Sequence, residues 1–291
     1  MSVRWANHSD IGSSDVFEAL HSGLTVKLIS THRADLMTCR LTDSLSDVME
    51  RNMASYDFLP VIGPGSDGRE RIIGLFHAAR FFGVSSVEGN VRQQFNPLSE
   101  EYLVGADGSI LNFIKDAGEK PCRLVVSGTE IVGLVTLSDL QKLPVRAALF
   151  ALITGFEITM FNAIKRECLN DQDWMRFLSD GRQKKISEEI ARSRKGDSFV
   201  DALLFTQFCD KAEILVKCLP LARSKTKLHD QLNAIQKLRD KIAHANEYAA
   251  SPEHARKVSA LVRGLLVLKG EIEAIKTIEP HSVSMDASMK A

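Results

Sequence analysis

Two stretches of the chain share one pattern: residues 131–140 read IVGLVTLSDL, and residues 72–81 read IIGLFHAARF. Each begins with β-favouring apolar residues around a glycine and passes into a segment that is typical of a helix start. Each also closes a longer unit, in which a strand leads to a helix, to two strands joined by a turn, and to a short helix. Because the unit occurs twice, the sequence predicts two copies of one supersecondary structure.

The two copies together account for the first half of the chain. The first is predicted as a strand at 25–30, a helix at 44–54, strands at 58–62 and 72–76, and a helix at 77–82. The second is predicted as a strand at 101–105, a helix at 109–119, strands at 124–126 and 131–135, and a helix at 137–143. We therefore expect two β-α-β-β-α repeats in an α+β domain at 25–144.

The character of the sequence changes at Pro144. Residues 1–144 contain 13 Lys and Arg against 18 Asp and Glu, whereas residues 145–280 contain 23 against 18. The excess of positive charge in the second half fits either a mixed-sign surface or an anionic partner. Helical periodicity after Pro144 predicts helices at 145–169, 172–194, 199–219, 227–248 and 252–278. We expect an all-α bundle at 145–279, with an N-terminal segment at 1–24 and a flexible tail at 280–291.

The end of the second copy carries the most specific pattern. Residues 133–140, Gly-Leu-Val-Thr-Leu-Ser-Asp-Leu, match the G-φ-φ-T-x-x-D-φ ending of cystathionine-β-synthase (CBS) domains. Residues 59–62, Leu-Pro-Val-Ile, are similar to the first core strand of that family. The stretch 25–144 thus resembles a tandem CBS domain pair, the Bateman module. The resemblance implies that an adenosine nucleotide (AMP, ADP or ATP) binds as a regulatory ligand in a cleft between the repeats.

Thr136 and Asp139 are the candidate nucleotide-binding residues. They stand three apart at the start of a helix and can face the same groove. A carboxylate there accepts hydrogen bonds from ribose hydroxyls, while a threonine hydroxyl and helix N-terminal N–H groups suit a phosphate. The same spacing also fits a capping box, with Thr136 as N-cap and Asp139 as the third helical residue. The spacing leaves both interpretations open, and the family resemblance favours the nucleotide.

The first copy departs from this ending at the same two positions. His77 and Arg80 stand where the second copy has Thr136 and Asp139. Because an arginine has no acceptor for a ribose hydroxyl, this copy is expected to have lost nucleotide binding of the family's kind. We therefore predict one competent adenosine site in the pair.

The first predicted helix after Pro144 is apolar on nearly all sides. Residues 147–161 contain a single charged side chain, Glu157, near the centre. Its length approaches a membrane span, but a carboxylate there costs about 2.5–3.5 kcal/mol in lipid on insertion scales. Burial in a bundle or in a dimer seam explains the composition equally well. We expect burial, with a basic partner for Glu157 and no membrane partner, and docking at a membrane is the weaker alternative.

The fourth predicted helix has one apolar stripe. The stripe follows 4-3-3-4 spacing and comprises Leu228, Leu232, Ile235, Leu238 and Ile242. Asp240 and His244 lie one turn apart on the face away from the stripe, and Arg239 lies on its flank. An exposed i, i+4 pair beside a solvated arginine explains these residues without any chemistry.

Residues 238–246, Leu-Arg-Asp-Lys-Ile-Ala-His-Ala-Asn, also resemble the R-x4-H motif of HEPN domains (higher eukaryotes and prokaryotes nucleotide-binding). The resemblance implies an all-α bundle that forms a homodimer and brings two Arg/His sets into one groove. Many family members are metal-independent endoribonucleases, so Arg239, Asp240 and His244 are the candidate catalytic residues. An imidazole that titrates near neutral pH suits deprotonation of a ribose 2′-hydroxyl, with Asp240 orienting it. Arg239 suits the charge that develops on the phosphate.

The resulting prediction is a cytoplasmic homodimer in which a CBS pair senses an adenosine nucleotide and regulates a HEPN-like endoribonuclease acting on RNA. No HxE, HExxH or paired-carboxylate spacing indicates a metal site, so neither a metal nor a catalytic cofactor is expected. Five cysteines without CxxC spacing and an N-terminus without an apolar secretory core fit a reducing cytoplasm. The alternative is a non-catalytic, nucleotide-sensing adaptor or dimerisation protein.

Overall fold

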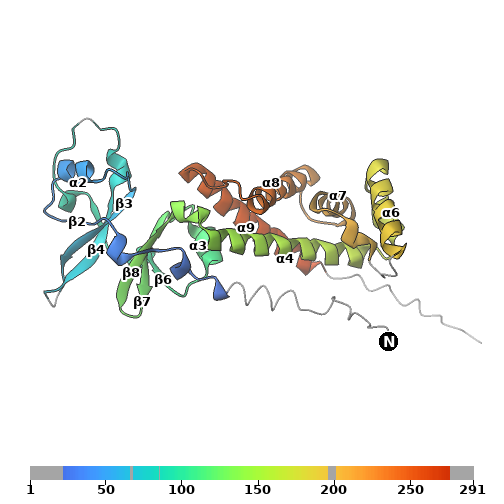
Figure 1. Ribbon diagram of the computed structural model, residues 1–291, viewed down its shortest axis with the longest axis horizontal. Helices are drawn as coiled ribbons and strands as arrows, with labels where there is room; N and C mark the ends of the chain where they lie inside the picture. The colour runs from blue at the N-terminus through green and yellow to red at the C-terminus, as the bar shows by residue number, and fades with distance from the viewer. Residues whose placement is uncertain (1–21, 66–67, 85, 196–200, 276–291) are drawn as a thin grey trace, which may run out of the picture. The chain divides into compact units, whose positions relative to one another are not determined.

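The computed structural model describes residues 22–65, 68–84, 86–195 and 201–275, and the chain divides into two compact units (Figure 1). The first unit comprises Met1–Ile153 and Leu238–Arg263, and the second comprises Thr154–Lys237 and Gly264–Ala291. Helices α4 (Leu143–Glu167), α8 (Lys225–Ala243) and α9 (Pro252–Ala274) each contribute to both units. The predicted boundary after residue 144 lies within α4, and the predicted tail lies outside the described residues, as does most of the N-terminal segment.

The first repeat forms a four-stranded sheet in the order β2-β3-β4-β5. Its elements are β2 (Cys39–Arg40), α2 (Leu45–Arg51), β3 (Phe58–Pro64), β4 (Glu70–His77), η4 (Ala78–Phe81), η5 (Val91–Gln93) and β5 (Phe95–Pro97). The Ser44 Oγ accepts the Asp47 N–H over 3.1 Å and so caps the start of α2. The predicted helix at 44–54 and strands at 58–62 and 72–76 are confirmed, with shifted ends.

The second repeat forms an equivalent sheet in the order β1-β8-β7-β6. Its elements are β1 (Thr31–His32), η6 (Glu100–Tyr102), β6 (Leu103–Gly105), α3 (Ile110–Asp116), β7 (Cys122–Ser127), β8 (Glu130–Thr136) and η7 (Leu137–Gln141). As in the first repeat, the leading strand is parallel to its neighbour, and the two long strands form an antiparallel pair. The β-α-β-β order predicted for this copy is confirmed, and the expected closing helix is a single 3-10 segment.

The strand predicted at 25–30 is wrong. Residues Val26–Leu28 form the 3-10 helix η2 instead. Val26 and Ile29 are both fully buried while Leu28 is 53% exposed, and a spacing of three places side chains on one face of a helical turn, not of a strand. The leading strand of the first repeat is β2, a dozen residues later.

A glycine at the same place in both repeats lets a fourth strand cross closely. β1 precedes the first repeat but pairs with β8, where His32 lies opposite Gly133; β5 precedes the second repeat but pairs with β4, where Pro97 lies opposite Gly74. A Cβ at Gly133 would lie 2.5 Å from the Thr31 carbonyl oxygen, and one at Gly74 would overlap the carbonyl oxygen of the facing strand. The glycine shared by the two repeats is therefore required by strand packing.

The two sheets share a hydrophobic core. Ile72 and Leu75 of β4 pack with Cys122 and Leu124 of β7 and with Leu134 of β8. Each buried side chain of this kind stabilises the fold by about 1.5–3 kcal/mol relative to the exposed state. The repeats therefore form one body within the first unit.

The start of α9 also packs on the second repeat. The Ser259 hydroxyl, fully buried, donates to the Lys115 carbonyl over 2.9 Å and accepts the Gly118 N–H over 3.2 Å. The Arg263 guanidinium donates to the same Lys115 carbonyl over 2.6 Å. These contacts satisfy groups that the end of α3 leaves without intrahelical partners.

The second unit is helical. Besides its parts of α4, α8 and α9, it contains α5 (Asp171–Met175), α6 (Asp180–Lys195), η8 (Ala202–Phe205) and α7 (Phe208–Cys218). The single helices predicted at 172–194 and 199–219 are each broken in two. Trp174 and Leu178 both pack into the core at the first break, and α6 then starts anew beyond Ser179, whose carbonyl accepts the Arg182 N–H. A serine at that place is a helix-start signal that the periodicity alone does not reveal.

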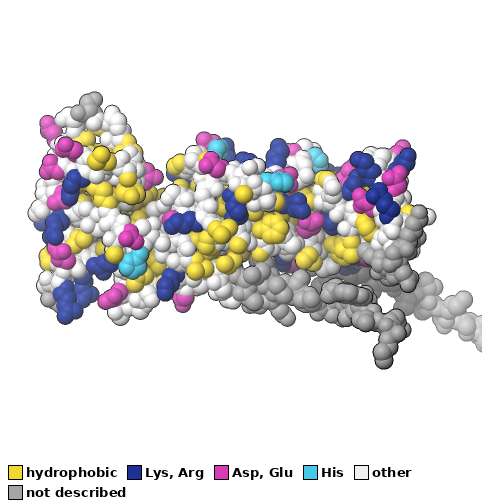
Figure 2. Space-filling model, in the orientation of Figure 1, with side chains coloured by type: hydrophobic (Ala, Val, Ile, Leu, Met, Phe, Trp, Pro, Cys, Tyr) yellow, Lys and Arg dark blue, Asp and Glu magenta, His cyan; other side chains and the backbone are white. Residues whose placement is uncertain are grey.

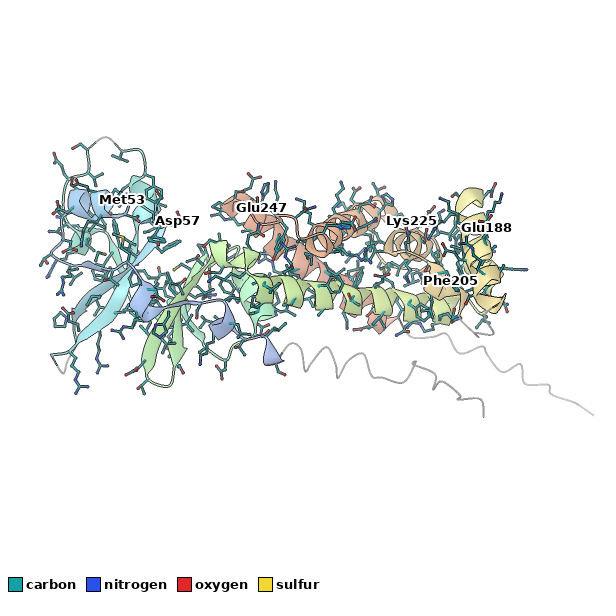
Figure 3. All side chains as sticks on the ribbon, viewed as in Figure 1. Met53, Asp57, Glu188, Phe205, Lys225 and Glu247 are labelled. Atoms are coloured by element: carbon teal, nitrogen blue, oxygen red, sulfur yellow. The ribbon has the colours of Figure 1, made fainter. Side chains whose placement is uncertain are left out.

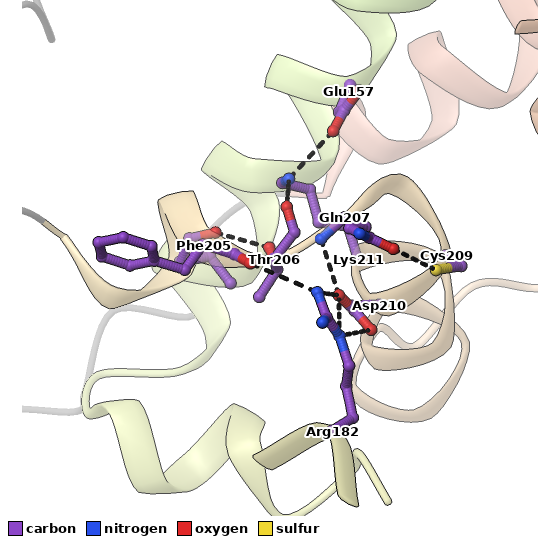
Figure 4. Close-up of polar contacts among 9 residues, drawn as sticks. Glu157, Arg182, Phe205, Thr206, Gln207, Cys209, Asp210 and Lys211 are labelled. Carbon is purple, nitrogen blue, oxygen red and sulfur yellow. Dashed lines mark hydrogen bonds and ion pairs between the residues drawn. The ribbon is translucent and has the colours of Figure 1, made fainter. Parts of the chain in front are cut away.

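Glu157 has the basic partner that its burial requires (Figure 4). Its Oε1 lies 3.0 Å from the Nζ of Lys211, which is buried and also donates to the Thr206 carbonyl over 2.7 Å. Beside this pair, the Arg182 Nε lies 2.9 Å from each oxygen of the buried Asp210. The basic partner predicted for Glu157 is confirmed, and the carboxylate itself is only partly buried. Of the described helices, α4 is the one whose length and composition would allow it to cross a membrane, and 44% of its apolar window is buried.

Candidate functional site

The first unit contains a pocket of about 350 Å³ between the two repeats. The ends of β3 and β4 form one wall, the ends of β7 and β8 form a second, and the connection from α8 to α9 forms a third. The lining residues with polar or aromatic side chains are Asp57, Phe58, His77, Thr136, Ser138, Ser251 and Arg256. A cavity of this volume falls within the range of small-molecule sites.

Thr136 lies in the wall of the pocket, whereas Asp139 does not. The Thr136 backbone N–H donates to the Asp139 Oδ2 over 2.6 Å, and the Lys142 Nζ lies 2.7 Å from the other oxygen of that carboxylate. Asp139 is only 6% exposed. The contacts of this carboxylate are thus those of the capping alternative. The Thr136 hydroxyl bonds to the Ser138 hydroxyl at 2.8 Å, so two hydroxyls lie together at the pocket. A role of Thr136 and Asp139 in nucleotide binding stays a prediction.

His77 stands in the first repeat at the position of Thr136 and also lines the pocket. Its ring stacks on Phe58 with centroids 4.3 Å apart and planes inclined by 12°. Burial and the nearby Arg80 lower the pKa of the imidazole, and Asp57 opposes the shift. The imidazole is therefore mainly neutral at pH 7, and it lines the cavity as part of an aromatic stack.

Asp57 and Phe58 are lining residues that the sequence reasoning missed. Asp57 is exposed and marks the side of the pocket that belongs to the first repeat (Figure 3). Asp57 directly precedes β3 in the first repeat, as Pro121 directly precedes β7 in the second, and both line the pocket.

The third wall was also missed, and several contacts hold it in place. The buried Tyr248 hydroxyl donates to the Leu140 carbonyl over 2.5 Å. With its amide turned so that the oxygen faces these groups, the Gln141 side chain accepts the N–H groups of Tyr248, Ala249 and Ala250 at 3.1, 2.8 and 3.2 Å. The wall is therefore built on the short helix η7 that ends the second repeat. No local sequence signal predicts this, because the two segments lie more than a hundred residues apart.

The predicted catalytic residues lie at the end of α8. The buried stripe predicted for this helix is confirmed, since each of its five residues is at most 6% exposed. The helix ends at Ala243, not at residue 248, because Ala245 turns to a φ of 56° and the Asn246 N–H bonds to the Lys241 carbonyl over 2.9 Å. These features form a Schellman ending. His244 is thus the cap residue that directly follows the last helical residue, Ala243.

Asp240 and His244 are exposed, and Arg239 is partly exposed. The Arg239 Nη1 lies 3.6 Å from the Asp240 Oδ1. Among the described residues, no hydrogen bond joins the Asp240 carboxylate to the His244 imidazole. The roles expected of Arg239, Asp240 and His244 stay predictions. Within residues 22–275, where described, no three His, Cys, Asp or Glu side chains gather as metal ligands.

Arg146 fixes the end of α8 beside these residues. Its guanidinium donates to the carbonyls of Lys241, Ile242 and Asn246 at 3.1, 3.0 and 3.0 Å. It also lies 5.0 Å from the centroid of the Tyr248 ring. A cation at a helix C-terminus satisfies free carbonyls and complements the helix dipole.

The sequence profile of the CBS domain matches residues 28–84. No curated protein matches the chain. Among solved structures, the CBS domain of a bacterial CNNM/CorC family Mg²⁺ transporter in complex with ATP is 20% identical, over 44% of this chain and 92% of its own, with a TM-score of 0.34. CBSX2 in complex with AMP is 20% identical, over 43% and 96%, with a TM-score of 0.33. The CBS domains of a transcriptional regulator from Streptococcus pneumoniae are 20% identical, over 40% and 95%, with a TM-score of 0.31.

The profile match extends from η2 to the residues after η4 and thus covers the first repeat from β2 to η4, whose ending departs from the family pattern at His77 and Arg80. The helical region that follows the repeats contains α4 to α9, and its relation to HEPN domains stays a prediction. The family assignment therefore rests on the first repeat: this chain contains a CBS domain at residues 28–84.

Proposed function

We propose that this protein is an adenosine-nucleotide sensor whose ligand binds in the pocket between a pair of CBS repeats. The observation that carries the proposal is that the equivalent endings of both repeats line one cavity. His77 comes from the first ending, and Thr136 and Ser138 come from the second. A CBS domain at residues 28–84 supplies one of these walls.

The walls offer chemistry for a base and a ribose. The stacked rings of Phe58 and His77 provide an aromatic surface for a purine. The Thr136 and Ser138 hydroxyls both donate and accept hydrogen bonds. The exposed Asp57 carboxylate can accept bonds from ribose hydroxyls.

Asp139 is the residue that the family resemblance implies as acceptor for the ribose hydroxyls, but both of its oxygens already accept hydrogen bonds within the protein. One of its oxygens holds the Thr136 N–H and the other holds Lys142. A ribose hydroxyl would have to share or displace one of these donors. A carboxylate oxygen accepts more than one hydrogen bond, so sharing is chemically feasible.

Calorimetric titration with AMP, ADP and ATP tests the site. We expect Asp139→Ala and Thr136→Val to weaken binding, by about tenfold or more for the carboxylate, because hydrogen bonds to charged groups contribute about 1.5–3 kcal/mol. Asp107→Asn, at an exposed turn of the second repeat outside the pocket, is the matched control. Undiminished binding by Asp139→Ala would remove that residue from the site, and absence of binding by the wild type would refute the sensor.

A second function, RNA cleavage by a homodimer, is favoured by the exposure of Asp240 and His244 at the end of α8. In this proposal His244 removes the proton of a 2′-hydroxyl, the 2′-oxygen attacks the adjacent phosphorus, and the P–O5′ bond breaks. The 5′-oxygen leaves as a hydroxyl after taking a proton from the solvent, and Arg239 stabilises charge on the phosphate without a metal. Two copies would complete one groove. Large apolar side chains are exposed along α4, where Figure 2 shows hydrophobic surface, and they suit the seam of such a dimer: Leu143 (75%), Phe150 (46%) and Ile158 (40%).

The ribonuclease proposal is tested by incubating the protein with structured RNA in EDTA, with and without adenosine nucleotides. We expect cleavage that leaves 2′,3′-cyclic phosphate ends and is lost in His244→Ala. His229→Ala, which removes an exposed imidazole from the same helix, is the control. RNA that stays intact under every nucleotide condition would favour a nucleotide-sensing adaptor without catalysis. We propose a cytoplasmic location and no membrane partner for the protein, both with and without ribonuclease activity.

A further inference from the structure

We infer that Arg256 of α9 recognises the phosphate of the ligand, an inference that rests on the proposed nucleotide site. Arg256 belongs to neither repeat, yet it lines the pocket together with residues 249–252. It lies one turn after Pro252, the first residue of α9. The helical part of the first unit thus contributes a charged group to a cavity that is otherwise built by the repeats.

The charges around the pocket assign this role to Arg256. Of the described residues that line the cavity, Arg256 carries the one permanent positive charge. Asp57 is negative, and the imidazole of His77 is neutral at pH 7 because burial lowers its pKa. Arg80 does not line the cavity. A phosphate in the pocket would therefore meet only neutral donors and a carboxylate if Arg256 were removed.

The guanidinium also has the geometry and the freedom for this contact. A guanidinium binds a phosphate through two parallel N–H groups, which gives more affinity than a neutral donor. Within the described part of the chain, no ion pair or hydrogen bond engages the Arg256 side chain. Ser251 and Pro252 place the positive end of the α9 dipole at the same wall. The Ser251 hydroxyl accepts the His254 N–H over 3.2 Å, which leaves the guanidinium as the strongest donor there.

A phosphate contact of this kind decides which ligands the pocket accepts. A nucleotide in the pocket would contact Thr136 of the second repeat and Arg256 of α9, and it would thereby connect these two elements. A nucleoside has the same base and ribose but lacks the group that Arg256 binds. Discrimination between nucleoside and nucleotide should therefore depend on this one side chain.

Titration of the full chain with adenosine, AMP and ATP tests the inference, with Arg256→Gln compared with Lys257→Gln. Lys257 is the adjacent residue on α9, pairs with Glu253 at 2.7 Å and lies outside the pocket, so its substitution removes the same charge. We expect Arg256→Gln to weaken AMP and ATP binding by about tenfold or more and to leave adenosine binding unchanged. Lys257→Gln should stay within about twofold of the wild type for every ligand.

The outcomes separate this inference from the function on which it rests. If Arg256→Gln weakens adenosine and AMP equally, or weakens neither, the phosphate assignment is overturned and the nucleotide site stands. If the wild type binds neither adenosine nor nucleotides, the site itself falls and the inference falls with it. Because Arg256 is exposed, the variant is expected to fold, and a thermal melt verifies this.

Discussion

The two repeats have the same order of strands and helices, but among the residues that the structure describes, side-chain hydrogen bonds to helices beyond the pair come from the second repeat. At its ending, the Leu140 carbonyl accepts the hydroxyl of Tyr248, and Arg146 of α4 contacts the Tyr248 ring and the end of α8. Ser259 and Arg263 of α9 bind the end of α3. The first repeat ends in His77 and Arg80 and faces the helical segment across the pocket.

This difference indicates how a duplicated unit acquires two roles. The second repeat is the anchor for the helical part of the first unit. The first repeat supplies the family's recognisable fold and the aromatic wall of the pocket. A ligand between the repeats would therefore contact two different walls. The wall from the second repeat is bonded to the helices, and the wall from the first repeat is joined to the second through the central hydrophobic core.

The largest expected effect tests what the repeats have in common. We expect Gly133→Ala and Gly74→Ala each to lower the free energy of unfolding by about 2–3 kcal/mol, because the new Cβ would meet a carbonyl oxygen of the crossing strand. The loss should be greater at Gly74, where the contact is closer and the Phe95 ring also lies 2.9 Å away. Urea unfolding of both variants measures these losses.

Gly181→Ala is the matched control for this pair. Gly181 lies in α6, and a Cβ there would have no neighbour within 4 Å. Its substitution should raise stability slightly, since alanine has the higher helix propensity. If only one of the two repeat glycines proves sensitive, the structural equivalence of the crossing strands is wrong.

The strands that pack against these glycines also show which parts of the fold the sequence predicts and which it does not. β3, β4, β7 and β8 are predicted because each is a long apolar run bounded by turn residues. β1 and β5 contain two and three residues, and they exist because the chain crosses a glycine, which no local pattern reveals. The error at 25–30 has the same origin, since burial of Val26 and Ile29 in a helical turn depends on tertiary contacts.

A second prediction concerns the anchoring of the second repeat. Arg146→Gln removes three hydrogen bonds to carbonyls at the end of α8 and the contact with the Tyr248 ring. We expect a loss of about 2 kcal/mol in the free energy of unfolding, because bonds from a charged donor are among the stronger ones. Arg80→Gln removes an exposed arginine near the end of the first repeat and should change stability by less than about 0.5 kcal/mol. Equal losses in the two variants would show that the repeats are anchored alike.

The candidate site divides in the same way between what sequence can and cannot predict. Thr136 of the predicted pair lines the pocket and Asp139 does not, while Asp57 lines it without any motif of its own. Arg256 and residues 249–252 carry no pattern of their own, because Tyr248 and Gln141 bring them to the repeats only in the folded chain. The predicted end of α8 at residue 248 lies beyond the observed end for a related reason. Ala245 adopts a left-handed conformation, and the sequence has no glycine there to indicate a helix end.

The smallest expected effect is a difference between the two repeat endings in how the stability of the fold depends on pH. Burial and Arg80 lower the pKa of His77, against the opposing influence of Asp57. As the pH falls below about 6.5, the unfolded chain therefore binds a proton at this residue before the folded chain does. The stability present above that pH is lost progressively until the pKa of the folded state is passed. Thr136 at the equivalent position of the second repeat does not titrate.

His77→Thr transfers the residue of the second ending to the first and should remove this dependence. The thermal midpoint of the wild type should fall more than that of His77→Thr between about pH 7.5 and pH 5. His254→Thr, at an exposed position near the start of α9, controls for the loss of an imidazole elsewhere in the first unit. An equal fall in all three proteins would mean that the histidine wall of the pocket is no more sensitive to protons than its surroundings.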